Sequence, residues 1–399
     1  MSNSDNPEFD SDKYDSEEYD SDEYPELHPN LEALTEAATS QLHQQIVSPG
    51  WRRLTRGLSH EIYVAKTSSE LRLVARLSRT QEDIRKLESE VATMRYVKQR
   101  TRIPIPTVYV VETTTDNPVG MQYVIMERMP GAHLYDIWDE LSIEHQKSVL
   151  TDIADILTQL AALKFDRIGA LMSENGDMGP IHSSVLTADD VYSSSEKYLD
   201  AFVERMGKQL EPTEQLSNQL KNVLDILHAY CSTHARRPYL QPPFRLIHGD
   251  FDAQNILYIP SQSGDSPPTL SGVIDWENSF TGPLYFLIEY PIFIQDVHWS
   301  KEFYARNAIL RAHFIRMLAA ADSRIGAGTY IRDWFPHEKS STLNRFREIF
   351  MTGFDYVDTK MVESIIEGYL SEEQKGTGKP YTGRIDWTPD PPVWDDQKT

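Results

Sequence analysis

The chain has 399 residues, of which 40% are apolar and 10% aromatic, enough for a sizeable core and for two lobes or domains. Its formal net charge of −22 argues against a nucleic-acid-binding surface, because neutralising phosphates requires clustered Lys and Arg. No stretch reaches the roughly 18–20 apolar residues of a membrane helix, and the lone Cys231 excludes an intramolecular disulfide or a cysteine-built metal site. We therefore expect a cytoplasmic protein that binds neither nucleic acid nor membrane.

Both ends of the chain have compositions that do not favour folding. Residues 1–30 carry 11 acidic residues against the single Lys13. Such a segment cannot bury enough apolar surface to fold alone, so we expect a disordered acidic tail; a docking segment for a partner protein is the alternative. Residues 376–399 are Pro-rich near their end and are expected to be irregular.

Residues 31–128 predict a small β-rich lobe. A short helix is expected over residues 31–44, and strand-like alternation starts at Trp51. The clearest later elements are strands at residues 62–64, 71–77, 107–112 and 122–127, and a helix at residues 81–99. Pro130-Gly131 then breaks the chain.

Residues 129–375 predict a larger, mostly helical lobe. Helical spacing extends to Tyr230, interrupted by a Gly- and Ser-rich loop. Two short apolar runs, residues 244–247 and 270–274, are expected to be strands, and helices should resume at residues 301–321 and 360–369. The predicted fold class is α+β.

The run His248-Gly249-Asp250-Phe251-Asp252-Ala253-Gln254-Asn255 carries the strongest chemical signal. Asp250 follows an apolar strand in a short loop, where its carboxylate can take the proton of an incoming hydroxyl. Asn255 and Asp275, which ends the next strand, offer the amide and carboxylate oxygens that Mg2+ prefers. This order of groups favours phosphoryl transfer.

Together with Gly272-Val273-Ile274-Asp275-Trp276-Glu277, this run resembles the aminoglycoside phosphotransferase and choline kinase superfamily, including its uncharacterised fungal members. The resemblance implies a bilobal, protein-kinase-like fold with a small antiparallel β lobe, ATP as donor and a small-molecule hydroxyl as acceptor. It also implies that Asp250 is the catalytic base, that His248 shapes the catalytic loop, and that Asn255 and Asp275 bind Mg2+. The backbone of residues 127–129, from Glu127 to Met129, would contact the adenine.

The superfamily's phosphate-positioning cation falls on Arg76, where kinases usually have Lys. Its expected partner is Glu90, which faces the core on the helical wheel, whereas Glu88 faces the edge. The alternative is a solvent-facing Arg76. In the loop of residues 55–61, Ser59 and backbone amides can cover the phosphates, but the loop has one glycine and a plain hairpin turn explains it equally well.

Two other functional classes stay open from the sequence. Arg76 and the Gly-poor loop also fit a catalytically silent nucleotide-binding or scaffold protein, and His248, Asp250 and Asp252 fit a metal-dependent hydrolase. We expect a structural role for Asp252. Aromatic and acidic residues that can surround a cationic acceptor, but that are more typical of a core or rim, are Trp276, Tyr290 and Trp299 with Glu277 and Asp296.

Overall fold

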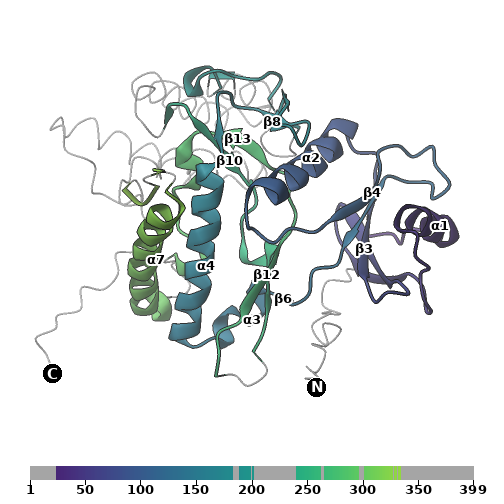
Figure 1. Cartoon of the computed structure of the whole chain (residues 1–399), viewed down its shortest axis with the longest axis horizontal. Helices are drawn as coiled ribbons and strands as arrows, with labels where there is room; N and C mark the ends of the chain where they lie inside the picture. The colour runs from purple at the N-terminus through teal and green to yellow at the C-terminus, as the bar shows by residue number, and fades with distance from the viewer. Residues whose placement is uncertain are drawn as a thin grey trace, which may run out of the picture. The chain divides into compact units, whose positions relative to one another are not determined.

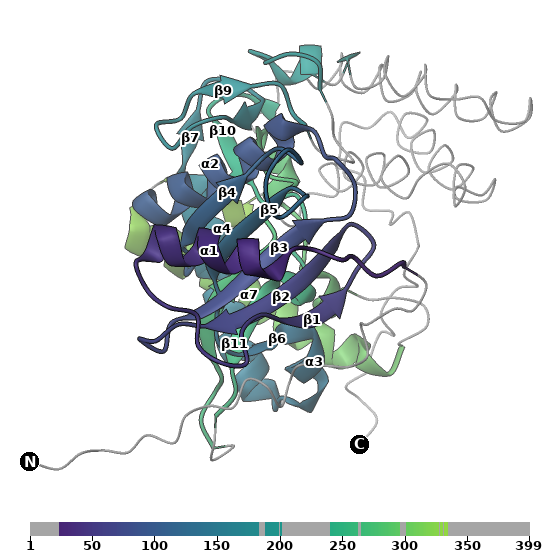
Figure 2. The same cartoon turned by 90° about the vertical axis from the view of Figure 1, so that its right-hand side faces the viewer.

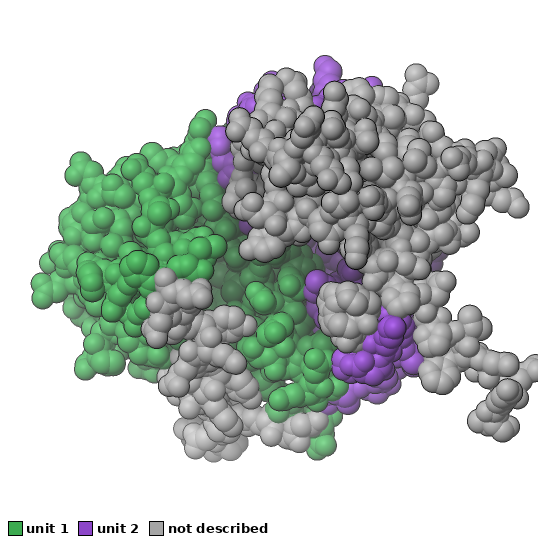
Figure 3. Space-filling view, turned by 180° about the vertical axis from the view of Figure 1, so that it is seen from behind, with its two compact units in different colours: residues 1–141, 171–177, 250–277 green, residues 142–170, 178–249, 278–399 purple. Residues whose placement is uncertain are grey.

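The computed structural model describes residues 24–182, 188–198, 200–201, 240–261, 265–295, 301–326, 328–329 and 331–333, shown in colour in Figures 1 and 2. The chain divides into two compact units, coloured in Figure 3. Unit 1 comprises residues 1–141, 171–177 and 250–277, and unit 2 comprises residues 142–170, 178–249 and 278–399. None of the helices in the described ranges has the length and apolarity required to cross a bilayer.

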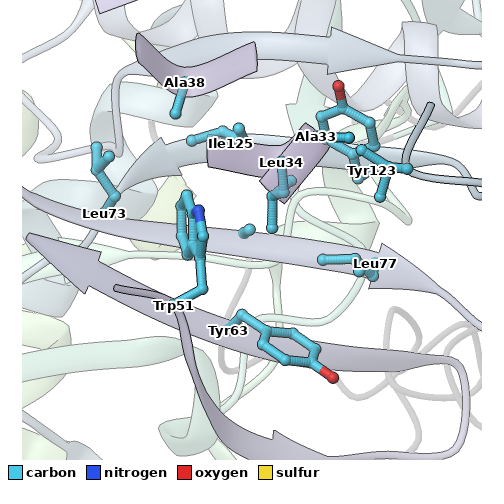
Figure 4. Close-up of a cluster of buried hydrophobic side chains, with 11 residues drawn as sticks. Ala33, Leu34, Ala38, Trp51, Tyr63, Leu73, Leu77, Tyr123 and Ile125 are labelled. Carbon is cyan, nitrogen blue, oxygen red and sulfur yellow. The ribbon is translucent and has the colours of Figure 1, made fainter. Parts of the chain in front are cut away.

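A five-stranded antiparallel sheet is the centre of unit 1. Its order is β1-β2-β3-β5-β4, with bounds Arg52–Arg56, His60–Lys66, Arg72–Ser78, Tyr123–Glu127 and Val108–Glu112. Side chains alternate across β3, so that Leu73, Ala75 and Leu77 are buried in the core shown in Figure 4. Val74 and Arg76 point to the opposite face and line a cavity. The strands predicted from the sequence are confirmed.

Two helices cover the two faces of this sheet, as both cartoon views show (Figures 1 and 2). Helix α1 (Leu31–Leu42) begins at Asn30, whose side chain accepts a hydrogen bond from Ala33 N–H. It packs Leu34 and Ala38 onto the sheet beside Trp51 (Figure 4). Helix α2 (Ile84–Arg100) begins at the N-cap Asp83 and buries an apolar stripe that includes Leu87, Val91, Met94 and Val97. The predicted 3.6-residue spacing of buried apolar residues in this helix is confirmed, except that Ile84, at its first position, is exposed.

A second, three-stranded sheet completes unit 1. Strand β6 (Ala132–His133) pairs with β11 (Ile256–Ile259), which pairs with β12 (Thr269–Val273). Gly131 makes this pairing possible, because it has φ +115° and a Cβ there would lie 2.5 Å from Tyr258 O. Short helices α3 (Leu134–Ile137), η3 (Trp138–Glu140) and η5 (Ala253–Asn255) also belong to unit 1.

Unit 2 is built on two long helices, α4 (Ile143–Ala162) and α7 (Tyr304–Ile325), which lie side by side. Thr151 Oγ1 lies 3.1 Å from His313 Nε2, and Arg324 forms an ion pair with Asp155, so polar groups link the two helices. The remaining described elements are the sheet β13-β10-β7 (Phe280–Gly282, Phe244–Ile247, Lys164–Phe165), β8 (Ala170–Leu171), β9 (Met178–Gly179), η6 (Leu284–Leu287), η7 (Ile292–Ile294), η8 (Lys301–Phe303) and η9 (Ile331–Asp333). The predicted strand at residues 244–247 is confirmed, and the predicted helix at residues 360–369 lies outside the described residues.

Residues 24–30 lie along the sheet of unit 1. Leu27 N–H donates to Glu61 Oε1 at 2.9 Å, and Glu61, which is fully buried, also accepts from Tyr63 Oη at 3.1 Å and Arg79 Nη2 at 3.0 Å. Arg79 donates further to Pro25 O, and Arg53 pairs with Glu26. From their composition these residues were expected to belong to the acidic tail, whereas their contacts place them with the sheet.

This contact network predicts different effects for two N-terminal deletions. Deleting residues 1–30 removes the Asn30 cap, worth about 1 kcal/mol, and the Leu27 donor to buried Glu61, worth about 1–3 kcal/mol. At about 2–4 °C of melting temperature per kcal/mol, we expect this variant to melt about 4 °C or more below a variant lacking residues 1–23 only. Equal melting temperatures in a thermal-unfolding experiment would show that residues 24–30 add nothing to folding.

Candidate functional site

A buried ion pair joins the large sheet to α2. Arg76 lies opposite Ile62 and Val124 in the sheet register, and its guanidinium pairs with Glu90 of α2; their side chains are 11% and 3% exposed. Burial acts to lower the pKa of Arg76, but Glu90 and Asp275 raise it above its ordinary value. The predicted pairing with Glu90 is confirmed, and Glu88 is exposed. Arg76 is therefore charged at any pH at which the protein folds.

Asp250 and Asn255 are held together by hydrogen bonds. Asn255 Nδ2 donates to both Asp250 O and Asp250 Oδ2 at 2.9 Å. Asp252 caps η5 by accepting from Ala253 N–H at 2.6 Å, which is the structural role expected for it. Because Nδ2 of Asn255 is used by Asp250, its Oδ1 is the atom that can face a cation.

Asp250 is exposed, and two effects act on its pKa in opposite directions. Partial burial of the carboxyl raises the pKa, as does the charge of Asp252 and Glu277, while the hydrogen bond from Asn255 lowers it; the net direction is upward. A carboxylate with a raised pKa is a better proton acceptor, and its exposure leaves it accessible.

Asp275 follows β12 and is brought next to Asn255 by a backbone hydrogen bond from Ile274 N–H to Asn255 O at 3.0 Å. Asp275 has φ +62°, a left-handed conformation that is unfavourable for a residue with a side chain and is found preferentially at functional sites. Its Oδ1 lies 3.9 Å from Arg76 Nη1. Burial, and then the charge of Glu277, raise the pKa of Asp275 to about 7 although its side chain is 36% exposed.

A cavity of about 330 Å³ lies within unit 1, in the size range of small-molecule sites. Six of the candidate residues line it: Arg76, Glu90, Glu127, Met129, Asn255 and Asp275. Its apolar walls come from both sheets and α2, and include Leu54, Ile62, Val74, Met94, Pro106, Met126, Leu257 and Ile274. The structure thus brings residues from widely separated parts of the sequence to one cavity.

Three candidate residues do not line this cavity. Ser59 lies in the β1–β2 hairpin loop, where its carbonyl accepts from Arg79 N–H at 2.9 Å, and the cavity is lined instead by Thr55 and His60. His248 is buried in unit 2, and its carbonyl accepts from Ser279 Oγ at 3.0 Å. Asp250 does not line the cavity, but its hydrogen-bond partner Asn255 does. Glu127, which does line the cavity, accepts a hydrogen bond from Thr107 Oγ1 through its carboxylate at 2.7 Å.

Of the three aromatic residues considered for a cationic acceptor, the structure describes Trp276 and Tyr290. Trp276 is fully buried and donates from Nε1 to Val273 O at 3.0 Å, so it is a core residue. Tyr290 packs against Phe314 in unit 2. Trp299 and Asp296 lie outside the described residues.

Sequence reasoning missed a polar group at this site. Lys86 of α2 contacts Glu82 and Glu277, and His60 contacts Glu82. The signal that could have found it is the spacing of Glu82, Lys86 and Glu90, which repeats every four residues and places them on one side of a helix.

Comparison with known proteins identifies the family. The profile of the phosphotransferase enzyme family (APH) matches residues 50–286, more than half of the chain. The chain belongs to this family. The phosphotransferase profile covers the β1–β2 hairpin, Arg76, Glu90 and the whole segment from His248 to Glu277.

Curated relatives of this phosphotransferase are fungal. It is 27% identical over 224 residues to clavilactone A biosynthesis cluster protein Y of Ampulloclitocybe clavipes, covering 52% of the chain and 53% of the relative. It is 28% identical over 130 residues to a subtelomeric hrmA-associated cluster protein of Aspergillus fumigatus, covering 32% and 26%. The chain therefore spans about a quarter to about half the length of these relatives.

Solved structures show the same fold at low identity. A candidate aminoglycoside phosphotransferase from Ralstonia eutropha has a TM-score of 0.54 and 13% identity, covering 88% of this chain and 97% of that one. A thermostable mutant of aminoglycoside phosphotransferase APH(4)-Ia, in ternary complex with AMP-PNP and hygromycin B, has a TM-score of 0.50 and 15% identity, covering 87% and 99%. These neighbours confirm the predicted kinase-like α+β fold.

The raised pKa of Asp275 predicts a pH-dependent effect of Asp275→Asn on stability. Its pKa lies above the ordinary value of 3.8, so the folded protein retains a proton that the unfolded chain releases between about pH 4 and 7. Ionised Asp275 therefore lowers stability as pH rises through this window, and the substitution removes the penalty. Without metal, the melting temperature of the variant relative to wild type should rise from pH 5 to pH 8.

The exposed Asp116 of unit 1 provides the control for this measurement. Asp116→Asn should show no such trend in EDTA-containing buffers. A difference between Asp275→Asn and wild type that is constant across the pH range would contradict the raised pKa.

Proposed function

We propose that this phosphotransferase moves the γ-phosphate of ATP to a hydroxyl of a small molecule, with Mg2+ as its metal. The observation that carries the proposal is the unit 1 cavity, where Arg76, Asn255 and Asp275 converge and where Asp250 is hydrogen-bonded to Asn255. Phosphoryl transfer depends on positioning and electrostatic stabilisation, and these four groups supply both.

The donor set fits Mg2+. Asn255 Oδ1 and the Asp275 carboxylate are hard oxygen donors that line one cavity, which suits Mg2+. When bound, Mg2+ neutralises charge on the nucleotide phosphates. Asn255 would hold it without adding charge beside Asp250, and Asp275 would supply the anionic ligand.

Arg76 would orient the phosphates beside the proposed metal site. Glu90 fixes its guanidinium, and the 3.9 Å between Arg76 Nη1 and Asp275 Oδ1 brings the cation next to the proposed metal ligand. A guanidinium can contact two phosphate oxygens, so Arg76 can replace the usual Lys with a different contact geometry.

Residues 127–129 would bind the adenine through their backbone. Glu127, Arg128 and Met129 line the cavity beside the apolar Met126 and Pro106. Arg128 N–H donates to Arg72 O at 3.0 Å, whereas Met129 N–H makes no hydrogen bond with any described residue. Met129 N–H therefore suits a base nitrogen acceptor, and AMP-PNP in the ternary complex of APH(4)-Ia supports an adenine nucleotide.

Asp250 would accept the proton of the acceptor hydroxyl. Its exposure gives the acceptor access, and Asn255 fixes its carboxylate. Hygromycin B in the complex of APH(4)-Ia supports a small-molecule acceptor. A metabolite-library screen for ATP-dependent phosphorylation would identify the acceptor class.

A catalytically silent nucleotide-binding protein is the second candidate. It is favoured by Arg76 in place of Lys and by the single glycine, Gly57, in the β1–β2 hairpin. A hydrolase built on His248, Asp250 and Asp252 has less support, because Asp252 caps η5.

Replacing Asp250 with Asn should separate chemistry from binding. The amide keeps the size of the side chain but cannot take the proton, so turnover should fall by roughly 100- to 10,000-fold while Mg-ATP affinity stays close to wild type. Steady-state kinetics on an acceptor found in the screen, with calorimetric nucleotide binding, make the measurement.

Asp252→Asn is the matched control for this experiment, because Asp252 is a carboxylate of the same loop with a capping role. It should lower stability and keep most of the turnover. If Asp250→Asn retains turnover, Asp250 is not the base; if it abolishes nucleotide binding, a metal-ligand role is indicated instead.

Replacing Asp275 with Ala should weaken Mg2+-dependent nucleotide binding more than binding without metal. The substitution removes the proposed anionic metal ligand and leaves the adenine contacts in place. Titrations of an ATP analogue with Mg2+ and with EDTA make the comparison, and equal losses in the two would remove Asp275 from the metal site.

A further inference from the structure

One side of α2 presents charged residues at four-residue intervals, and each contacts a different part of unit 1. Glu90 pairs with Arg76 of β3. One turn earlier, Lys86 Nζ lies 3.1 Å from Glu277 Oε2. One turn earlier again, before the helix begins, Glu82 Oε1 lies 2.7 Å from His60 Nε2 at the start of β2. Helix α2 and the residue before its N-cap thus contact three separate segments of unit 1.

Lys86 is the link between these contacts. Its ammonium lies between two carboxylates, 3.2 Å from Glu82 Oε2 and 3.1 Å from Glu277 Oε2. The side chain of Lys86 is 14% exposed and those of the two Glu residues are 16% exposed, so solvent screens these contacts less than surface ion pairs. Burial acts to lower the pKa of Lys86, but Glu277 and Glu82 raise it, so the ammonium stays charged.

Glu277 connects this network to the chemistry. It follows Asp275, the proposed anionic metal ligand, by two residues, so the contact of Glu277 with Lys86 also restrains the backbone that carries Asp275. A largely buried carboxylate needs a cation that partly neutralises it. Among the described side chains, the cation that contacts Glu277 at hydrogen-bonding distance is Lys86.

At the other end, the network supports the β1–β2 hairpin. His60 lines the cavity and contacts Glu82. Gly57 N–H donates to His60 O at 2.9 Å, and Arg79 Nε donates to Gly57 O at 2.6 Å. These two hydrogen bonds and the His60–Glu82 contact hold the turn of the β1–β2 hairpin.

Building on the proposed function, we propose that Lys86 is a positioning residue of the magnesium-nucleotide site, which holds Glu277 beside Asp275 and, through Glu82 and His60, fixes the β1–β2 hairpin over the same cavity. Lys86 acts through these carboxylates and does not itself contact the metal or the transferred phosphate.

The test is the Mg2+ concentration at half-saturation for binding of a non-hydrolysable ATP analogue to the full chain. In Lys86→Met, Glu277 is no longer held in place, and the half-saturating Mg2+ concentration should rise about 10- to 100-fold, the effect typical of groups that orient metal ligands. If the only effect were the removal of a positive charge, the half-saturating Mg2+ concentration would fall, because a more negative site attracts Mg2+ more strongly. An unchanged or lowered value in folded Lys86→Met overturns the proposal.

Matched variants control the experiment. Lys86→Arg should restore most of the affinity, and Arg85→Met, at the exposed neighbouring cation, should leave Mg2+ half-saturation at the wild-type value. Glu277→Gln should raise the value as Lys86→Met does, and the double variant should be no worse than either single one. If Lys86→Met fails to fold, Lys86→Gln, which removes the same charge but keeps a polar side chain, takes its place, and a wild-type or lowered value there overturns the proposal.

The same titration separates the two proposals. Wild-type protein that shows no Mg2+-dependent nucleotide binding contradicts the proposed function. Wild-type protein that binds the nucleotide with Mg2+, while Lys86→Met and Glu277→Gln bind it equally well, contradicts only the role of Lys86.

Discussion

The buried contact between Arg76 and Glu90 is the constraint on which unit 1 depends. A guanidinium on the inner face of a sheet cannot stay buried without a counter-charge, and a carboxylate under a helix has the same requirement. Each therefore fixes the other, which sets the position of α2 relative to β3. The cavity between both sheets and α2 then has one wall whose charge is determined before any ligand binds.

The acidic balance of the site follows from this arrangement. Glu82, Glu90, Asp250, Asp275 and Glu277 lie near two permanent cations, Arg76 and Lys86. Burial of Asp275, together with the neighbouring charge of Glu277, raises the pKa of its carboxyl. An excess of carboxylates attracts cations and repels free polyphosphate, which supports the proposed metal site.

Much of this could be predicted from the sequence, because the relevant signals are local. The period of α2 and the strands of the large sheet followed from spacing, whereas the Arg76–Glu90 pair followed from the family resemblance together with the helical wheel. The spacing of Glu82, Lys86 and Glu90 places these three residues on one side of a helix, but the contact of Lys86 with Glu277 could not be predicted, because the two residues are 191 positions apart. The docking of residues 24–30 was missed for a related reason: composition indicated solvation, whereas buried Glu61 and Arg79 supply partners for their backbone.

The contact of residues 24–30 with Glu61 and Arg79 has a consequence for engineering. Arg79 donates both to Pro25 O and to Gly57 O, so the N-terminal segment and the tip of the β1–β2 hairpin share one guanidinium. Whatever is fused directly before Tyr24 is tethered next to that hairpin, at an effective concentration set by the linker. A fluorophore or an inhibitory peptide attached there would stay close to the β1–β2 loop in every molecule. No cysteine would have to be introduced into the folded part for this attachment.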